Sequence, residues 1–431
     1  MILIYSHKLT NRLKYIFTTI FKDVLLTPVE FTQDPETFKQ HPDVKINYTS
    51  KNLGSGLFFQ SSTLLFENGI TEQNISVFKH EEYPCFFAVS KESALPFDPF
   101  AASFYLISRY EEYLPHIRDE HERFNAMESL AYKHRFLQLP LVNIWINQIE
   151  QIIRKAYPEF NFPERKFQFI STIDIDNAYA YKHKGNLRAF GGLIKGIKEG
   201  TFAKRIRVLM GKEHDPYDTF DYQNQIHKKH NISPVYFILL GDYGVNDKNI
   251  PVNNRAFQSL IKSLADYTTV GIHPSYASNS SNEQLTKEIK RLQDITHRNT
   301  TKSRQHFLKL VLPVTYRNLI ENDIEEDYTM GYADHCGFRA SICSPYQFYD
   351  LDTESITNLT IIPFTVMEAT FQYYQNGSPE EVRQQIHELM QKVKDVKGTF
   401  VSVWHNESLS DEGIWKGWKN VYEFMLEEAG L

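Results

Sequence analysis

After residue 163 the chain alternates short apolar segments with amphipathic stretches, and this alternation limits the folds it can adopt. The apolar segments are KFQFISTID, SPVYFILLGD, TTVGIH, SRQHFLKLVL, DYTMGYA, LTIIPFTVM and TFVSVWHN. Strands that alternate with helices predict parallel β-α-β units, so we expect a distorted (β/α) barrel of about seven strands. Two of the intervening helices begin with candidate capping boxes, Ser280 with Glu283 and Ser378 with Glu381.

The first part of the chain predicts a separate, smaller domain. The segments MILIY, DVKINYTS and CFFAVS are strand candidates, and NRLKYIFTTIFKDVL, DPFAASFYLISRYEEYLP and LPLVNIWINQIEQIIRKAY have helical spacing. The segment PEFNFPERK, which contains prolines and charges, marks a boundary after them. A chain of 431 residues is also too long for one ordinary core. We therefore expect a mixed α/β domain over residues 1–163 and the (β/α) barrel over residues 164–431.

Charge and cysteine content exclude several classes of protein. The formal net charge is −6 and both signs are spread along the chain, so a nucleic-acid binder is not expected. Three cysteines without a paired framework favour a reducing compartment, and we expect a cytoplasmic protein. Charged residues interrupt the N-terminal segment MILIYSHKLTNRLKYIFTTIFKDVLL, and no small-residue cleavage site follows it. We expect a strand and a helix there, and neither a signal peptide nor a membrane span.

Polar residues stand at the ends of three predicted strands. Asp174 and Asp176 end the first strand, His273 ends TTVGIH, and His405 ends TFVSVWH. Sites in parallel α/β sheets and barrels gather at the carboxyl ends of strands and draw on several strands. One such residue has a simple alternative as a turn or capping group, but three strand ends form a convergent set. We expect these side chains to meet at one rim.

The segment SRQHF adds an arginine and a further histidine. On a strand, residues i and i+2 share a face, so Arg304 and His306 are expected to point the same way. By the same rule Asp174 and Asp176 share a face if their strand stays regular. Mixed histidine and aspartate ligation with an open position is typical of a hydrolytic, zinc-type site. His306 is equally well explained as a buried histidine with satisfied hydrogen bonds.

These motifs, in this order, resemble the polysaccharide deacetylases of carbohydrate esterase family four, whose fold is a distorted (β/α) barrel. The resemblance extends from about residue 165 to about residue 425. The whole chain is similar to a bacterial group that joins such a barrel to an N-terminal domain of unknown function. The role of that domain stays open between recognising glycan, binding a partner and packing against the barrel.

The resemblance implies roles for the aspartates and the first histidine. The family has two adjacent aspartates, one a general base and one a metal ligand, whereas TIDIDN separates them by Ile175. Asp174 is then the base and Asp176 the ligand, although the opposite assignment is also open. His273 corresponds to a metal-binding histidine, but the position four residues later, a second histidine in the family, is Ala277 here.

The remaining roles fall on later motifs. Arg304 corresponds to the arginine that holds the catalytic aspartate, and His405 corresponds to the general acid. His306, on the face expected for Arg304, is our candidate for the missing third ligand, on geometry and not on the resemblance. Arg339 and Glu368 are candidates to bind substrate or orient His405.

Together these assignments predict a metal-dependent hydrolase that removes N- or O-linked acetyl groups from an acetylated glycan. The expected cofactor is a divalent metal, with zinc preferred, which polarises the acyl carbonyl. Asp174 takes a proton from water, and His405 protonates the leaving amine or alkoxide.

Alternatives remain open from the sequence. The Asp-x-Asp pair also occurs in metal-dependent glycosyltransferases, but that class explains neither His273 nor His405. A haloacid-dehalogenase-like phosphatase uses the same pair, but Ala178 stands where a threonine or valine is usual. A barrel that has lost catalysis and binds glycan or scaffolds a partner is favoured by Ala277 and opposed by Asp174, Arg304 and His405.

Overall fold

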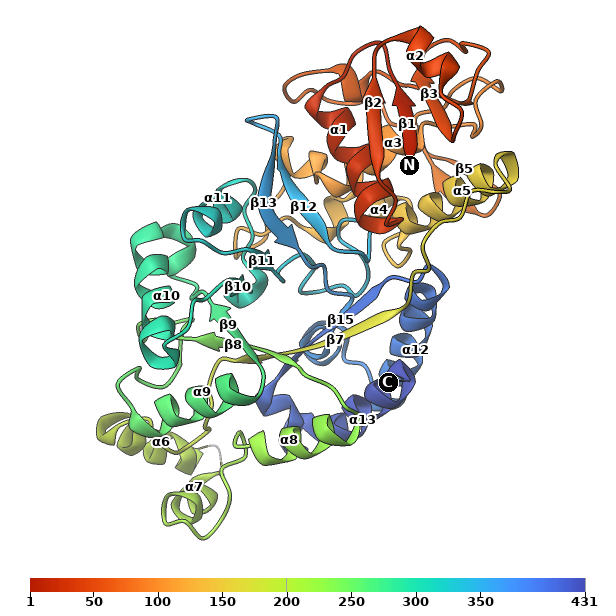
Figure 1. Ribbon diagram of the computed structural model, residues 1–431. Helices are drawn as coiled ribbons and strands as arrows, with labels where there is room; N and C mark the ends of the chain where they lie inside the picture. The colour runs from red at the N-terminus through yellow and green to blue at the C-terminus, as the bar shows by residue number, and fades with distance from the viewer. Residues whose placement is uncertain (199, 431) are drawn as a thin grey trace.

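The structure is a computed structural model that describes residues 1–198 and 200–430. Its class is mixed α/β with parallel-strand sheets, as predicted (Figure 1). The chain enters the second sheet through its first strand, β7 (Gln168–Ile175), after the long helix α5 (Leu141–Ala156). We call residues 1–163 the N-terminal part and the remainder the C-terminal part. None of the described helices is long and apolar enough to cross a bilayer.

The N-terminal part contains a four-stranded parallel sheet in the order β2-β1-β3-β4. Its strands are β1 (Ile2–Tyr5), β2 (Val29–Thr32), β3 (Lys45–Thr49) and β4 (Leu57–Gln60), and a separate hairpin pairs β5 (Phe78–His80) with β6 (Tyr83–Cys85). The helices are α1 (Asn11–Phe17), α2 (Pro35–Gln40), α3 (Pro99–Ile107), α4 (Leu130–Lys133) and α5. Helix α1 continues as a π-helical segment over Thr18–Val24, as its apolar spacing predicts.

The C-terminal part contains a nine-stranded sheet in the order β12-β13-β11-β10-β9-β8-β7-β15-β14. In that order the strands are β12 (Tyr346–Asp350), β13 (Ser355–Ile361), β11 (Glu326–Asp327), β10 (Lys302–Ser303), β9 (Thr269–His273), β8 (Val235–Leu239), β7, β15 (Thr399–His405) and β14 (Val366–Met367). The neighbours from β13 to β14 all pair in parallel, and β12 joins β13 antiparallel. In the part of the chain that the structure describes, β12 and β14 do not pair, so the sheet is an open form of the expected barrel.

Helices surround the curved sheet on its outer side (Figure 1). They are α6 (Asn186–Lys198), α7 (Phe202–Leu209), α8 (Phe220–Lys229), α9 (Arg255–Tyr267), α10 (Asn282–Thr296), α11 (Val314–Glu321), α12 (Pro379–Asp395) and α13 (Trp418–Ala429). The capping box predicted for Ser378 and Glu381 is confirmed at the start of α12. The box predicted for Ser280 and Glu283 is wrong by one residue, because Ser281 caps α10 by accepting the N–H of Gln284.

Several strand predictions fail between Arg304 and Met367. The chain leaves the sheet after β10 and forms a 3₁₀ turn over His306–Leu308, so the predicted strand through SRQHFLKL is wrong. LTIIPFTVM divides into the end of β13 and the short β14, because Pro363 cannot donate a ladder hydrogen bond. The sequence analysis also missed β12, whose partner β13 starts five residues after it in a hairpin.

The hydrophobic core is continuous between the two parts. The hairpin of β12 and β13 leans toward α1 (Figure 1), and the Tyr349 ring packs 4.9 Å from that of Tyr15 and 5.2 Å from that of Phe104. Together these packed rings fix the N-terminal part against the end of the sheet.

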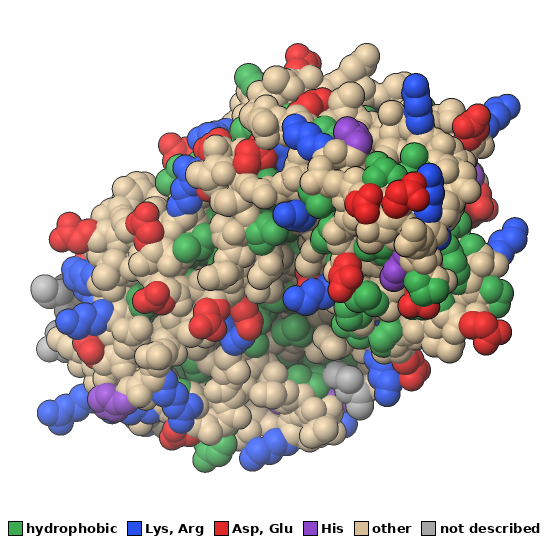
Figure 2. All heavy atoms as spheres, turned by 45° about the horizontal axis from the view of Figure 1, so that its top comes forward, with side chains coloured by type: hydrophobic (Ala, Val, Ile, Leu, Met, Phe, Trp, Pro, Cys, Tyr) green, Lys and Arg blue, Asp and Glu red, His purple; other side chains and the backbone are tan. Residues whose placement is uncertain are grey.

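Positive and negative side chains are interspersed over the face shown in Figure 2, with no broad area of one sign.

Candidate metal centre

The sheet register brings the polar strand ends to one edge. His405 on β15 pairs in register with Asp174 on β7, and β8 lies between β7 and β9, with Leu239 opposite His273. The strand stays regular through Ile175, which pairs with Ile238 and is buried in the core. Because side chains alternate along a strand, Ile175 points into the core while its aspartate neighbours point to the rim.

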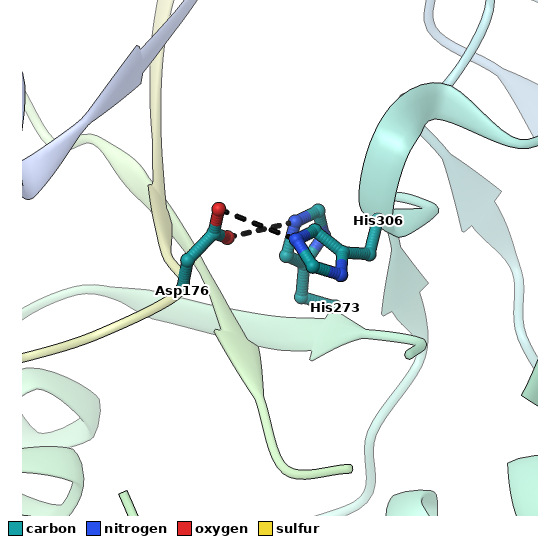
Figure 3. Close-up of side chains that lie close together, drawn as sticks. All are labelled: Asp176, His273 and His306. Atoms are coloured by element: carbon teal, nitrogen blue, oxygen red, sulfur yellow. Dashed lines mark ion pairs between the residues drawn. The ribbon is translucent and has the colours of Figure 1, made fainter. Parts of the chain in front are cut away.

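Three side chains at this rim form a group suited to a metal ion (Figure 3). Asp176 follows β7, His273 ends β9, and His306 begins the 3₁₀ turn after β10. Nε2 of His273 lies 3.2 Å from Asp176 Oδ1, and Nε2 of His306 lies 3.3 Å from Asp176 Oδ2. All three ligand atoms lie within 4.8 Å of one another. This is the ligand set expected from the sequence.

The partner of Nδ1 in each histidine ring determines whether Nε2 presents a proton or a lone pair to Asp176. Nδ1 of His273 contacts the Arg304 carbonyl, and Nδ1 of His306 lies 2.9 Å from Asp247 Oδ1. Both partners only accept, so each Nδ1 carries the proton, and a neutral ring then presents a bare Nε2 to the carboxylate. No described residue donates a hydrogen bond to the buried Asp176 Oδ1. The two Nε2 atoms and the Asp176 carboxylate are then all acceptors. Their close approach requires either protonated imidazolium rings that donate to the carboxylate or a cation bound between them.

The spacing of the group fits a cation. Two ligand atoms bound to one tetrahedral zinc ion at about 2.0–2.1 Å lie roughly 3.3–3.4 Å apart, close to the two separations above. A set of two imidazoles and one carboxylate with an open position is also typical of catalytic zinc. The residues present therefore fit the divalent metal that the sequence resemblance implies.

The charges of the group are strongly coupled. Burial alone would raise the pKa of Asp176, but His306, His273 and His405 outweigh it and hold that pKa well below the ordinary value. Burial opposes the charged form of His306, yet Asp176 and Asp247 raise its pKa to about 9. A cation bound here would take the place of these imidazolium charges.

Asp247 is a part of the site that the sequence analysis missed. Besides the ring of His306, its carboxylate accepts the backbone N–H of Tyr276 at 2.8 Å and that of Ala277 at 3.3 Å. The residue four positions after His273 therefore contributes a backbone donor where the related family has a histidine. Asp247 lies in the polar loop GDYGVNDKN after a predicted strand, and this position after a strand end is the signal that would mark the loop as a candidate.

Asp174 is held beside the metal group by Arg304. Its Oδ1 lies 3.4 Å from the Arg304 guanidinium, and its Oδ2 lies 3.9 Å from His273 Nε2. Arg304 is fully buried, with its guanidinium carbon 4.9 Å from the centre of the Phe237 ring. Burial lowers the pKa of Arg304, and the charges of Asp174 and Asp327 oppose that shift. The structure thus pairs Asp174, the expected general base, with Arg304, the arginine expected to orient its carboxylate.

His405 forms a second pair at the rim, with Glu368. Glu368 Oε1 accepts both the backbone N–H and Nδ1–H of His405 at 2.7 Å, and Nε2 lies 4.0 Å from Asp176 Oδ2. Burial disfavours the imidazolium, but Glu368, Asp176 and Asp174 raise the pKa of His405 well above its ordinary value. Nearby, burial raises the pKa of Glu407 to about 7, and the charge of His405 opposes that shift.

A cavity of about 160 Å³ opens over Asp174, Asp176, His273, His306 and His405. Its other walls include Arg123, Phe307, Leu308, Met367, Tyr373 and Tyr374.

Arg339, a predicted substrate ligand, does not line this cavity. Its guanidinium is buried and binds both Glu112 oxygens, at 2.9 and 2.7 Å, and the Gly331 carbonyl at 3.1 Å. Glu368 lies behind His405, where it orients that ring.

Comparisons with known proteins give one family match and several fold matches. Residues 2–158 match a family described as a family of unknown function, DUF7033, and this region lies within the N-terminal part. No curated protein matches the chain.

Solved structures that can be superposed on part of this chain include deacetylases and a pseudoenzyme. A putative polysaccharide deacetylase from Mycobacterium smegmatis is 13% identical with a TM-score of 0.39, over 61% of this chain and 85% of that one. A probable polysaccharide deacetylase from Pseudomonas aeruginosa is 10% identical with a TM-score of 0.40, over 61% and 84%. A pseudoenzyme of the CE4 family from Bacillus anthracis is 11% identical with a TM-score of 0.32, over 61% of each chain. At such values the overlap says nothing about activity.

Proposed function

We propose that the chain is a metal-dependent hydrolase that removes N- or O-linked acetyl groups from a carbohydrate. The observation that carries the proposal is the group of Asp176, His273 and His306 at one cavity with the Asp174–Arg304 and His405–Glu368 pairs. The restriction to acetylated carbohydrate comes from the order of motifs along the sequence, which resembles carbohydrate esterase family four.

Each group at the rim has a role in this chemistry. Zinc or a similar ion, when bound, polarises the acyl carbonyl as a Lewis acid. Asp174 accepts a proton from the attacking water, and Arg304 fixes the direction in which its carboxylate points. His405 donates a proton from Nε2 to the leaving amine or alkoxide, since its Nδ1–H is committed to Glu368.

The cavity walls suit a sugar. Tyr373 and Tyr374 are about half exposed at the rim, and their flat apolar ring faces suit stacking against the C–H face of a pyranose ring. Arg339, buried against Glu112, has no place in this scheme.

The test is acetate release by the zinc-loaded protein from two panels, N-acetylated and O-acetylated oligosaccharides. The proposal predicts release from at least one panel, loss of release when the metal is removed, and loss in Asp174→Asn. A zinc-loaded protein that releases no acetate from either panel contradicts it. Retained glycan binding in that case would favour the non-catalytic barrel, and transfer from a nucleotide sugar would favour the glycosyltransferase.

A further inference from the structure

The turn that carries His306 has an unusual backbone. Phe307 has φ 60° and Leu308 has φ 52°, so two consecutive bulky residues adopt the left-handed conformation that glycine favours. Such a conformation is costly and persists only where the surroundings hold it in place. The position of His306 Nε2 therefore depends on what restrains this turn.

A loop of the N-terminal part, residues 119–123, lies against this turn. Arg123 donates a hydrogen bond from Nη1 to the Phe307 carbonyl at 2.8 Å, across 184 positions of sequence. Glu122 forms an ion pair with Lys309 at 2.8 Å, and the ring of His121 packs edge-on against that of Phe307, with 4.9 Å between centroids. The N-terminal part therefore holds the turn that carries His306.

Arg123 is a fixed donor within this contact. Its Nε donates to Asp119 Oδ2 at 2.6 Å, and only 11% of its side chain is exposed. Asp119 Oδ1 in turn accepts the backbone N–H groups of His121 and Arg123, both at 2.9 Å. The loop itself thus directs the guanidinium toward the Phe307 carbonyl, which is how a supporting residue fixes a ligand-bearing element.

We infer that the N-terminal part completes the metal centre, with Arg123 as a positioning residue that holds the His306 turn in its ligating geometry. Asp247 fixes the ring of His306 from one side, and Arg123 fixes the backbone that carries the ring. The inference rests on the metal centre of the proposed function and not on the identity of the substrate.

Metal binding in the absence of substrate tests the inference, because Arg123 also lines the cavity and its loss can affect turnover directly. Metal-free, full-length wild-type protein, Arg123→Ala, Arg123→Lys and Arg118→Ala are titrated with Co²⁺, and the visible absorption of the bound ion is recorded. Arg118 is a matched control, since it lies in the same region, its side chain is exposed, and that side chain donates a hydrogen bond to His116.

The expected result is a loss of Co²⁺ affinity in Arg123→Ala of about tenfold or more, as for other outer supports of metal ligands. Its visible spectrum changes as well, because a displaced imidazole alters the ligand field. Arg123→Lys recovers part of the affinity by donating to the Phe307 carbonyl alone. Arg118→Ala keeps wild-type affinity and spectrum. Equal thermal unfolding midpoints of the metal-free variants show that the change is local.

Wild-type affinity and spectrum in Arg123→Ala overturn the inference, and so does an equal loss in Arg118→Ala. If Arg123→Ala does not fold, Arg123→Lys decides, because unchanged affinity and spectrum of the lysine variant with a lowered unfolding midpoint would show a purely structural role. A wild-type protein that binds Co²⁺ but releases no acetate overturns the proposed function, and the comparison of variants still decides the inference.

Discussion

Asp174 lies beside the three candidate metal ligands and is held by Arg304, and the proposed function makes it the base and Asp176 the ligand. We predict that Asp174→Asn lowers kcat for acetate release by about 10²–10⁴-fold, because an amide cannot accept the proton of water. Zinc affinity stays near the wild-type value. Steady-state kinetics and a calorimetric zinc titration measure both. A variant that loses zinc instead would show that Asp174 and Asp176 exchange roles.

Asp247 is expected to control metal affinity through the ring of His306. Asp247→Asn weakens the hydrogen bond to Nδ1–H and should lower zinc affinity by about 10–100-fold. Asp242→Asn is the matched control, because Asp242 lies in the same loop but is 57% exposed and pairs with Lys287 and Arg291. Calorimetric titration of both variants measures the difference, and equal affinities would exclude a role for Asp247 in the site.

At the scale of single residues, the sequence was informative where a polar side chain ends an apolar strand. Asp174, Asp176, His273 and His405 could be placed at one rim because parallel strands end together. Asp247 could not be placed, because its position depends on how a loop folds back over the rim. The hydrophobic periodicity of the sequence does not show how this loop folds.

At the scale of elements, Gly271 sets how closely β9 approaches its neighbours. A Cβ at this position would lie 2.7 Å from the Lys302 carbonyl oxygen and 2.8 Å from the Phe237 ring. We predict that Gly271→Ala lowers the free energy of unfolding by about 1–3 kcal/mol, the usual cost of overpacking, because β9 or β10 must shift. Urea denaturation measures this. Gly244→Ala is the control, since its nearest atom would be 3.9 Å away; equal losses would contradict the explanation.

The His306 turn shows where strand prediction fails. The apolar pattern of SRQHFLKL predicts a strand, and of this segment only Ser303 belongs to one. The strand on which Arg304 and His306 were expected to share a face is therefore wrong, although both side chains still reach the aspartates at the rim, His306 through the left-handed turn. Arg123, Glu122 and His121 contact this turn from the N-terminal part, and a single sequence does not show such contacts.

At the scale of the whole molecule, a buried ion cluster joins the two parts. Glu112 accepts from Arg109 at 2.7 Å and from Arg339 at 2.9 and 2.7 Å, and all three side chains are nearly inaccessible to solvent. We predict that Glu112→Gln lowers the free energy of unfolding by about 3–5 kcal/mol at neutral pH, since it removes the charge partner of the buried Arg339 guanidinium, whereas Arg109 keeps its ion pair with Glu111 at 2.9 Å. Equal denaturation midpoints for variant and wild type would contradict this.

The same cluster predicts a pH dependence. Burial would raise the pKa of Glu112, but Arg339 and Arg109 outweigh it and lower the pKa from 4.5 to about 2. A lowered folded-state pKa contributes stability that is complete above the ordinary pKa and is lost as pH falls toward the folded value. The stability difference between wild type and Glu112→Gln should therefore shrink from about pH 4.5 to about pH 2. Denaturation curves across this range measure it, and a constant difference would show that Glu112 does not titrate as described.

The two-part organisation was only partly accessible from the sequence. Chain length and the segment PEFNFPERK suggested a boundary near residue 163, and two separate sheets lie on either side of it. The burial of Arg339 against Glu112 was not predictable, because the two residues lie 227 positions apart and meet only when the parts pack together. The contact of Arg123 with the His306 turn is of the same kind.

The central claim is that Asp176, His273 and His306 bind one divalent metal ion. Anomalous diffraction from crystals of the full chain soaked in zinc, collected on both sides of the zinc absorption edge, tests it most directly. We predict one strong anomalous peak at about 2.0–2.2 Å from Asp176 and from Nε2 of both histidines. A peak elsewhere, or none at this rim with zinc in excess, would contradict it.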